Sequence, residues 1–147
     1  MREKRLLTIQ DISCVGQCSL TVALPILSAF GLETAILPSA VLSTHTGGFT
    51  GYTFRDFTDD IPAIAEHWKK ENLKFDAFYT GYVGSKKQLE YISDIIKTLG
   101  TDNAVTVIDP VMGDNGKLYT GFDEEFAAEM AKFCSLADVI LPNFTEA

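Results

Sequence analysis

Several features that mark common protein classes are missing from this sequence. No apolar run approaches the roughly 20 residues of a membrane-spanning helix, and the first residues lead into strand-like sequence without a cleavable signal pattern. Basic residues are also few, because 12 Lys and Arg face 20 Asp and Glu and give a formal net charge of −8. Such a charge argues against nucleic acid or an anionic membrane as the main partner. A cytoplasmic location is therefore the default expectation.

Cysteine and histidine are scarce as well. The three cysteines are Cys14, Cys18 and Cys134, an odd number, and no Cys/His spacing matches a zinc site. We therefore expect reduced thiols that mostly serve packing. His67 lies beside Trp68 in a predicted helix and is expected to be a surface or packing residue.

Motifs of three nucleotide-binding or hydrolytic classes are absent. The stretch 80–86 (TGYVGSK) resembles a P-loop but lacks its four-residue gap before Gly-Lys-Ser/Thr. No G-x-G-x-x-G follows the first predicted strand, and no G-x-S-x-G elbow supports a hydrolase triad. A nucleotide substrate nevertheless stays possible for an acidic chain, because a bound metal ion supplies positive charge locally.

Strand-like and helix-like segments alternate along the 147 residues. Short β-branched or apolar runs predict strands over 6–10, 33–37, 77–80, 104–108 and 139–141. Apolar residues at helical spacing predict helices over about 20–30, 61–72, 89–99 and 124–133. This order predicts an α/β fold of three layers, αβα, around a mostly parallel sheet. Because a helix should cover the sheet after the last strand, we expect the domain to be incomplete at its C-terminal end.

Single residues refine these boundaries. Ser19 and Asp123 are predicted N-caps, and Pro38 is expected to close the second strand. Pro25 predicts a kink in the first helix, or a helix that starts late. The loop after the first strand is expected to begin at Asp11. Between the second strand and second helix, the segment at about 39–55 is rich in small, polar and turn-forming residues and is expected to be a flexible flap.

The strand at 104–108 leads into the most informative stretch of the chain. Asp109-Pro110 ends this strand, and Asp114 follows in a loop. Two solvated aspartates in a turn would also give this pattern. However, polar residues follow three other strands too, and the carboxyl ends of parallel strands meet at one edge of a sheet, where ligands bind. Mg²⁺ is typically held by one or two carboxylates and the phosphates of a substrate, so we expect a metal–nucleotide site here.

Four motifs together resemble the ribokinase-like superfamily, specifically its pyridoxal/pyridoxamine (pyridoxine) kinase family. They are Ser43-Thr-His-Thr-Gly47, Thr80-Gly-Tyr-Val-Gly84, Asp109-Pro-Val-Met-Gly-Asp114 and Leu141-Pro-Asn-Phe-Thr-Glu146-Ala147. The resemblance covers the whole chain and implies that residues 1–147 form the N-terminal part of one kinase domain. It also implies a homodimer.

The resemblance implies a role for several residues. The substrate ring would be contacted by Asp11, His45, Thr46 and Tyr82. Asp11 stands where many pyridoxal kinases have a serine. The ATP co-substrate would be contacted by Asp109, Asp114, Tyr119 and Asn143. Mg²⁺ would be held near Asp109, Asp114 and Glu146, with a monovalent cation as a further candidate. The catalytic base of the family lies in a Gly-Thr-Gly-Asp segment, which residues 1–147 lack, so the base is expected beyond Ala147.

Three functional hypotheses follow. The first is ATP- and Mg²⁺-dependent phosphorylation of the hydroxymethyl group of pyridoxal, pyridoxine or pyridoxamine, with this chain alone expected to be inactive. The second keeps the fold and changes the substrate to hydroxymethylpyrimidine in thiamine synthesis. The third is a non-catalytic remnant that binds a vitamer or a protein partner.

Overall fold

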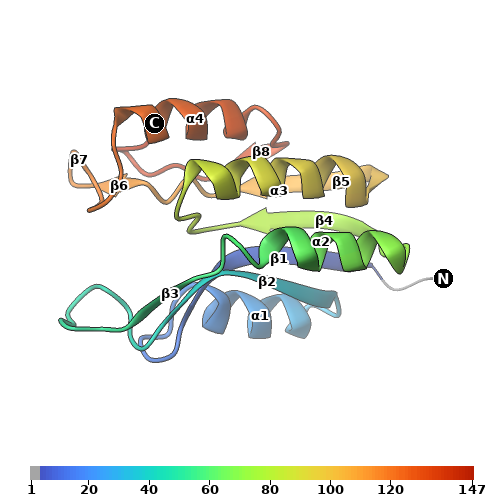
Figure 1. Cartoon of the computed structure of the whole chain (residues 1–147), viewed down its shortest axis with the longest axis horizontal. Coiled ribbons are helices and arrows are strands. Elements are labelled where there is room, and N and C mark those ends of the chain that lie inside the picture. The colour runs from blue at the N-terminus through green and yellow to red at the C-terminus, as the bar shows by residue number, and fades with distance from the viewer. Residues whose placement is uncertain (1–3) are drawn as a thin grey trace.

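The computed structural model describes residues 4–147, and a six-stranded sheet forms its centre (Figure 1). Its strands are β1 (Arg5–Ser13), β2 (Glu33–Leu42), β3 (Phe54–Asp56), β4 (Phe75–Thr80), β5 (Gly100–Ile108) and β8 (Val139–Ile140). They lie in the order β3-β2-β1-β4-β5-β8, and every neighbouring pair is parallel except β2 with β3. The predicted mostly parallel sheet is confirmed.

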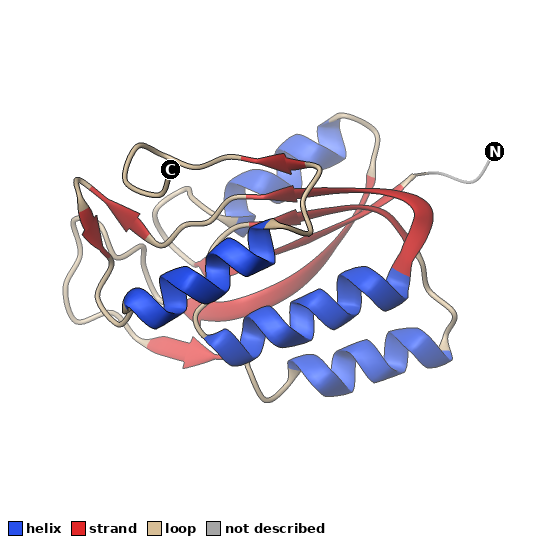
Figure 2. Cartoon of the chain, turned by 90° about the horizontal axis from the view of Figure 1, so that it is seen from above, coloured by secondary structure: helices blue, strands red, loops and turns tan. Residues whose placement is uncertain are grey.

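Helices cover both faces of this sheet. They are α1 (Leu20–Ala29), α2 (Ile61–Lys70), α3 (Lys86–Leu99) and α4 (Glu124–Cys134). Three helices lie side by side on one face and one lies on the other (Figure 2), and the contacts of α3 with α2 and α4 identify the group of three. The predicted αβα layering is thus confirmed. None of the helices within residues 4–147 combines the length and apolar character that crossing a membrane requires.

The core lies between the sheet and the three helices α2, α3 and α4. Leu7 and Ile9 of β1 are fully buried there with Phe78 of β4 and Ile92 of α3. Alternation along β1 and β4 sends every second side chain to this face, so a short strand supplies several core residues. Deleting a buried phenylalanine such as Phe78 typically costs about 3–5 kcal/mol.

The opposite face is thinly covered. Leu20 is the buried residue of α1, whereas Ile26 of the same helix and Phe30 directly after it are 51% and 80% exposed. Val139 and Ile140 of the edge strand β8 are also about half exposed, at 47% and 49%. Apolar surface is therefore exposed around α1 and on β8, as it also is on the 49–54 segment and at Phe144.

Several strand boundaries differ from the prediction: β5 begins at Gly100 and not at residue 104, and the ends of β1 and β2 lie further along the chain. Asp11 does not begin a loop, because β1 continues to Ser13. Pro38 does not close β2, which continues to Leu42. Here Gln10 pairs with Pro38 and Ile12 with Val41, so β2 carries one extra residue beside the proline. A bulge of this kind lets a residue without an N–H group remain in a sheet.

Helix ends and turns show a similar mixture. Asp123 caps α4 as predicted, with Oδ1 accepting from Phe126 N at 2.7 Å. Ser19 precedes α1, but its side chain makes no capping bond, and α1 starts at Leu20 with Pro25 inside it. Ser85, which was not predicted as a cap, accepts from Gln88 N at 3.2 Å.

A small hairpin follows β5 and was missed. Its strands are β6 (Gly113–Asp114) and β7 (Lys117–Leu118), and Asp114 pairs with Lys117. Asn115 and Gly116 form the turn with φ of 52° and 76°. Asn-Gly between paired strands is a strong hairpin signal, because both turn residues adopt positive φ. Asp114 therefore sits on a defined turn rather than in an open loop.

Candidate active site

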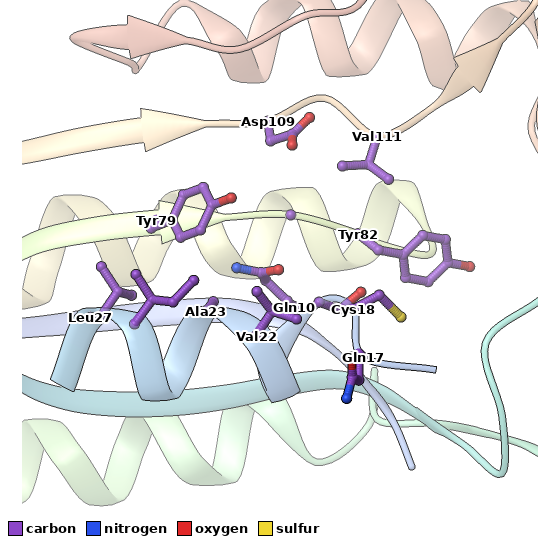
Figure 3. Close-up of a pocket in the computed structure, with 13 residues that line it drawn as sticks. Gln10, Gln17, Cys18, Val22, Ala23, Leu27, Tyr79, Tyr82, Asp109 and Val111 are labelled. Carbon is purple, nitrogen blue, oxygen red and sulfur yellow. The ribbon is translucent and has the colours of Figure 1, made fainter. Parts of the chain in front are cut away.

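The carboxyl ends of β1, β4 and β5 open into a cavity of about 430 Å³ (Figure 3). Its sheet side is lined by Gln10, Tyr79, Gly81, Tyr82, Asp109 and Val111. Its other side is lined by Gln17, Cys18 and Ser19 and by the α1 residues Val22, Ala23, Ile26 and Leu27. An apolar wall facing a few polar groups, at this volume, is typical of a small-molecule site.

The predicted site residues fall into two groups, and one residue of each group lines this cavity. We call Asp11, Tyr82 and the flap residues His45 and Thr46 the Tyr82 side. We call Asp109, Asp114, Tyr119, Asn143 and Glu146 the Asp109 side. Tyr82 and Asp109 both line the cavity, so the fold brings one member of each group to the same space.

Tyr82 is held at its backbone and at its ring. Its carbonyl oxygen accepts from Ser39 Oγ at 2.6 Å, and its ring centroid lies 5.9 Å from that of Phe122. Phe122 in turn stacks on Phe126 of α4 at 4.0 Å. Burial raises the pKa of Tyr82, and the charges of Asp11 and Asp56 raise it further. The phenol therefore stays protonated and can donate a hydrogen bond.

Asp11 is buried within β1 rather than exposed on a loop, with 6% of its surface accessible. Its Oδ2 accepts from Ser13 Oγ at 3.0 Å. Asp11 does not line the cavity of Figure 3, although its charge acts on Tyr82. The Asp11 carboxylate is thus near enough to Tyr82 to raise the pKa of its phenol.

The predicted flap is a β-hairpin with a regular stem. Val41 pairs with Arg55 in the stem, so the ends of the 39–55 segment are strand rather than flexible loop. At the tip, His45 N donates to Val15 O at 2.7 Å, and Gly47 N donates to His45 Nδ1 at 3.1 Å. His45 and Thr46 lie outside the lining of the cavity. The tip is nevertheless fastened to the loop after β1, next to the cavity-lining Gln17 and Cys18.

Asp109 is the central residue of the other side. Its backbone N–H donates to Thr80 O at 3.0 Å, which fixes it at the ends of β4 and β5. Burial raises the pKa of the Asp109 carboxyl, and the charge of Glu146 raises it further, while a hydrogen bond from the Val111 backbone lowers it. Val111 has φ of 39°, which is strained for a β-branched residue. Strain of this kind often occurs at functional sites.

Asn143 and Glu146 clasp the loop between Asp109 and Asp114. Glu146 Oε1 accepts from Met112 N at 2.8 Å and from Gly113 N at 3.3 Å. Asn143 N donates to Glu146 Oε2 at 3.0 Å, and Asn143 Nδ2 donates to Gly113 O at 2.7 Å. Both carboxylate oxygens of Glu146 are thus engaged with backbone amides. This arrangement suits a residue that shapes the loop.

Tyr119 lies near the three carboxylates of the Asp109 side. Its backbone N–H donates to Met112 O at 3.0 Å, and its ring is 42% exposed. Burial raises the pKa of Tyr119, followed by the charges of Asp114, Glu146 and Asp109. All five predicted residues of the Asp109 side therefore lie in one neighbourhood.

The Asp109 side fits a divalent cation of the Mg²⁺ type only in part. Its donors are carboxylate and amide oxygens, which such ions prefer, and no lysine or arginine of residues 4–147 forms an ion pair with Asp109, Asp114 or Glu146. Within the same residues, however, no three His, Cys, Asp or Glu side chains are grouped closely enough to hold a metal. This donor set matches an ion held by one or two carboxylates and completed by phosphate oxygens.

Sequence reasoning placed Cys18 near a pocket but missed most of the other lining residues, among them Gln10, Tyr79 and Val111. Burial raises the pKa of Tyr79, and the charge of Asp109 raises it further. Figure 3 shows the Tyr79 ring and the Asp109 carboxylate on neighbouring strands. The available signal was positional, since each of these residues lies near a predicted strand end or at the start of a predicted helix.

No family model matches the chain. A pyridoxal kinase from Sus scrofa is 31% identical over 154 aligned residues, which cover 99% of this chain and 47% of that enzyme. The solved pyridoxal kinase of Lactobacillus plantarum is 40% identical with a TM-score of 0.93, over 97% of this chain and 51% of that one. Over nearly its whole length, this chain is therefore similar to pyridoxal kinases. It spans about half the length of the relatives it matches.

A third similar protein bears on the substrate. It comes from Bacteroides thetaiotaomicron, has a provisional assignment as a phosphomethylpyrimidine kinase, and was solved with pyridoxal. It is 48% identical with a TM-score of 0.93, over 99% of this chain and 50% of that one. The name of that protein refers to a phosphorylated pyrimidine, whereas its structure holds pyridoxal.

Proposed function

We propose that this chain is the substrate- and metal-side half of a kinase that transfers the γ-phosphoryl group of ATP to the hydroxymethyl group of a B6 vitamer. The observation that carries the proposal is the joint lining of one cavity by Tyr82 and Asp109, at the ends of adjacent strands. Phosphoryl transfer needs an acceptor hydroxyl held in line with the phosphate and charge stabilisation around it. The two sides of the site would meet those needs separately.

On the Tyr82 side, the protonated Tyr82 would donate to the ring or stack on it, and buried Asp11 would orient an amine or alcohol substituent. His45 and Thr46 would close over the substrate at the flap tip. An apolar cavity wall beneath a phenol and a carboxylate suits a small, substituted heteroaromatic ring.

On the Asp109 side, Asp109 and Asp114 would hold Mg²⁺ together with the nucleotide phosphates. When bound, the ion neutralises charge that develops on the transferred group. Asn143 and Glu146 would keep the loop between these aspartates in shape, and Tyr119 would lie near the nucleotide. We propose the catalytic base outside residues 1–147, in a Gly-Thr-Gly-Asp segment that this chain lacks.

Three finer features belong to the proposal. They are a monovalent cation beside the phosphates, a homodimeric state and a cytoplasmic location. The exposed ring of Phe30, directly after α1, supports association with a second chain, because a large exposed apolar side chain favours burial against a partner.

Hydroxymethylpyrimidine is the second candidate substrate, because a protein 48% identical to this chain carries the related provisional assignment. The pyridoxal present in that structure favours the B6 vitamer. Competition between the two rings in one assay separates these alternatives.

The test fuses residues 1–147 to the second half of the Lactobacillus plantarum pyridoxal kinase, whose first half is similar to this chain. With Mg²⁺ and ATP, the fusion should phosphorylate pyridoxal and prefer it over hydroxymethylpyrimidine. Preference for hydroxymethylpyrimidine would establish the second candidate. A folded fusion that binds pyridoxal without forming ADP would favour the non-catalytic alternative.

A further inference from the structure

A buried glutamine joins the Tyr82 loop to the base of the flap hairpin. Gln88, in the first turn of α3, has no accessible surface. Its Oε1 accepts from Gly84 N at 2.9 Å, and its Nε2 donates to Ser39 O at 3.0 Å and to Thr58 Oγ1 at 2.9 Å. Both amide hydrogens and the carbonyl oxygen are therefore used. Turning this amide would leave buried partners unsatisfied, so its orientation is fixed.

Two of these partners flank the flap hairpin. Ser39 lies where β2 enters the hairpin, and Thr58 follows β3 where the hairpin ends. Phe57 N also donates to Ser39 O, at 3.1 Å, so this carbonyl accepts from both the hairpin and Gln88. Gln88 thus holds the two ends of the 39–58 segment together beneath the flap tip.

The other contacts reach Tyr82 from both of its flanks. Ser39 Oγ donates to Tyr82 O at 2.6 Å, and Gly84 N is held by Gln88. The ring folds back over Gly84, because a Cβ atom there would lie 3.3 Å from the Tyr82 hydroxyl oxygen. The position of the phenol consequently depends on where this short loop is fixed.

We propose that Gln88 and Ser39 are positioning residues that set Tyr82 against the substrate ring and link its position to the flap. The inference rests on the proposed function, which makes Tyr82 a ring contact. Every hydrogen bond in this cluster lies on the Tyr82 side of the cavity. Loosening it should therefore weaken ring binding and leave nucleotide binding unchanged, because only the fraction of molecules with Tyr82 in place binds the ring well.

The test compares Ser39→Ala with the matched control Ser93→Ala in the 147-residue chain. Both hydroxyls donate to a backbone carbonyl at nearly the same distance, 2.6 Å to Tyr82 O and 2.7 Å to Leu89 O. Pyridoxine is the ring probe, because it has no aldehyde to react with lysines. Titration calorimetry should show about tenfold weaker pyridoxine binding for Ser39→Ala. It should show less than about twofold change for Ser93→Ala, and Mg-ATP affinity should be unchanged in both.

Two additional measurements distinguish a displaced Tyr82 ring from a general loss of folding. In chain labelled with ¹³C-tyrosine, Ser39→Ala should shift the Tyr82 ring signals and leave those of Tyr91 in place. Thr58→Val removes only the flap-end partner of Gln88 and should weaken pyridoxine binding by about twofold to threefold. These spectra also show that each variant remains folded.

The outcomes separate this inference from the proposed function. The positioning role is overturned if Ser39→Ala binds pyridoxine as strongly as the wild-type chain does. It is also overturned if the variant loses pyridoxine and Mg-ATP affinity equally. In both cases, pyridoxine binding by the wild-type chain still supports the ring site. A folded wild-type chain that does not bind pyridoxine overturns the ring assignment of Tyr82, and the positioning role with it.

Discussion

The Tyr82 side and the Asp109 side satisfy their polar groups in opposite ways. Around Tyr82, the buried side chains of Ser39 and Gln88 donate to or accept from protein groups at 2.6–3.0 Å. Around Asp109, two further carboxylates lie nearby, and the pKa of Asp109 is raised by burial and by Glu146. Ser39 and Gln88 thus find their partners within this chain, whereas the Asp109 side carries excess negative charge that a cation would neutralise. Under the proposed function, the Tyr82 side would recognise the substrate ring and the Asp109 side would bind the metal ion and the phosphates.

The largest expected effect is on the Asp109 side. Asp109→Asn in the fusion enzyme should lower turnover of pyridoxal by about 100-fold or more, the range seen when one preorganised electrostatic group is removed from an active site. Its affinity for pyridoxine should change by less than about twofold, because Asp109 is assigned to the metal ion and phosphates and not to the ring. Steady-state kinetics and calorimetry measure the two quantities. An equal loss of pyridoxal turnover and pyridoxine affinity would show that the Tyr82 side and the Asp109 side do not act independently.

Tyr82 provides the opposite test. Tyr82→Ala should weaken pyridoxine binding by roughly tenfold, since an aromatic contact contributes about 0.5–1.5 kcal/mol beyond its buried area. Tyr82→Phe keeps the ring and its contact with Phe122, so it should lose only the hydroxyl contribution. Mg-ATP affinity should be unchanged in both variants. Equal affinities of the alanine variant and wild type for pyridoxine would remove Tyr82 from the ring site.

The hairpin turn beneath Asp114 allows a matched comparison of backbone strain. Gly116 and Gly31 have φ of 76° and 79°, and neither has an atom within 4 Å of an added Cβ. Alanine at either position should destabilise the fold by about 1 kcal/mol. Only Gly116→Ala should also raise the KM for Mg-ATP, because only this turn carries Asp114. Equal KM values for Mg-ATP in the Gly116→Ala and Gly31→Ala variants would show that the Asn115-Gly116 turn does not contribute to nucleotide binding.

The smallest expected effect concerns pH. Because the pKa of Asp109 is raised in the fold, its contribution to stability is fully present below its ordinary value of 3.8 and is lost as the pH rises through the raised value. Ionised Asp109 therefore destabilises the chain at neutral pH, and Asp109→Asn should unfold at a higher temperature there. The difference should shrink as the pH falls toward 3.8. Melting curves across this range test the sign, and a variant that is less stable at neutral pH would contradict it.

Much of the fold could be predicted because it rests on local patterns. Alternating strands and helices gave the parallel sheet, and Asp123 gave the start of α4. The Pro38 bulge could not be predicted, because it depends on how β2 aligns with β1. The extension of β1 through Asp11 depends on pairing of the same two strands. Local turn preferences were overridden there by the sheet.

The candidate site divides in the same way. Residues placed by strand ends, such as Tyr82 and Asp109, could be found from their positions after predicted strands. Gln88 could not, because a polar residue on a predicted helix is normally assigned to the surface. Its role becomes visible only in the fold, where Ser39 and Thr58, 49 and 30 residues away in sequence, lie beside Gln88 together with the nearby Gly84.

The most direct test of the divided site is an assay of ATP-dependent phosphorylation of pyridoxal by the 147-residue chain itself, with Asp109→Asn as control. Our account predicts a folded chain that binds pyridoxine and shows no turnover, with activity appearing only in the fusion. Turnover by the chain alone that Asp109→Asn abolishes would contradict it. Such a result would mean that residues 1–147 already contain every group the chemistry requires.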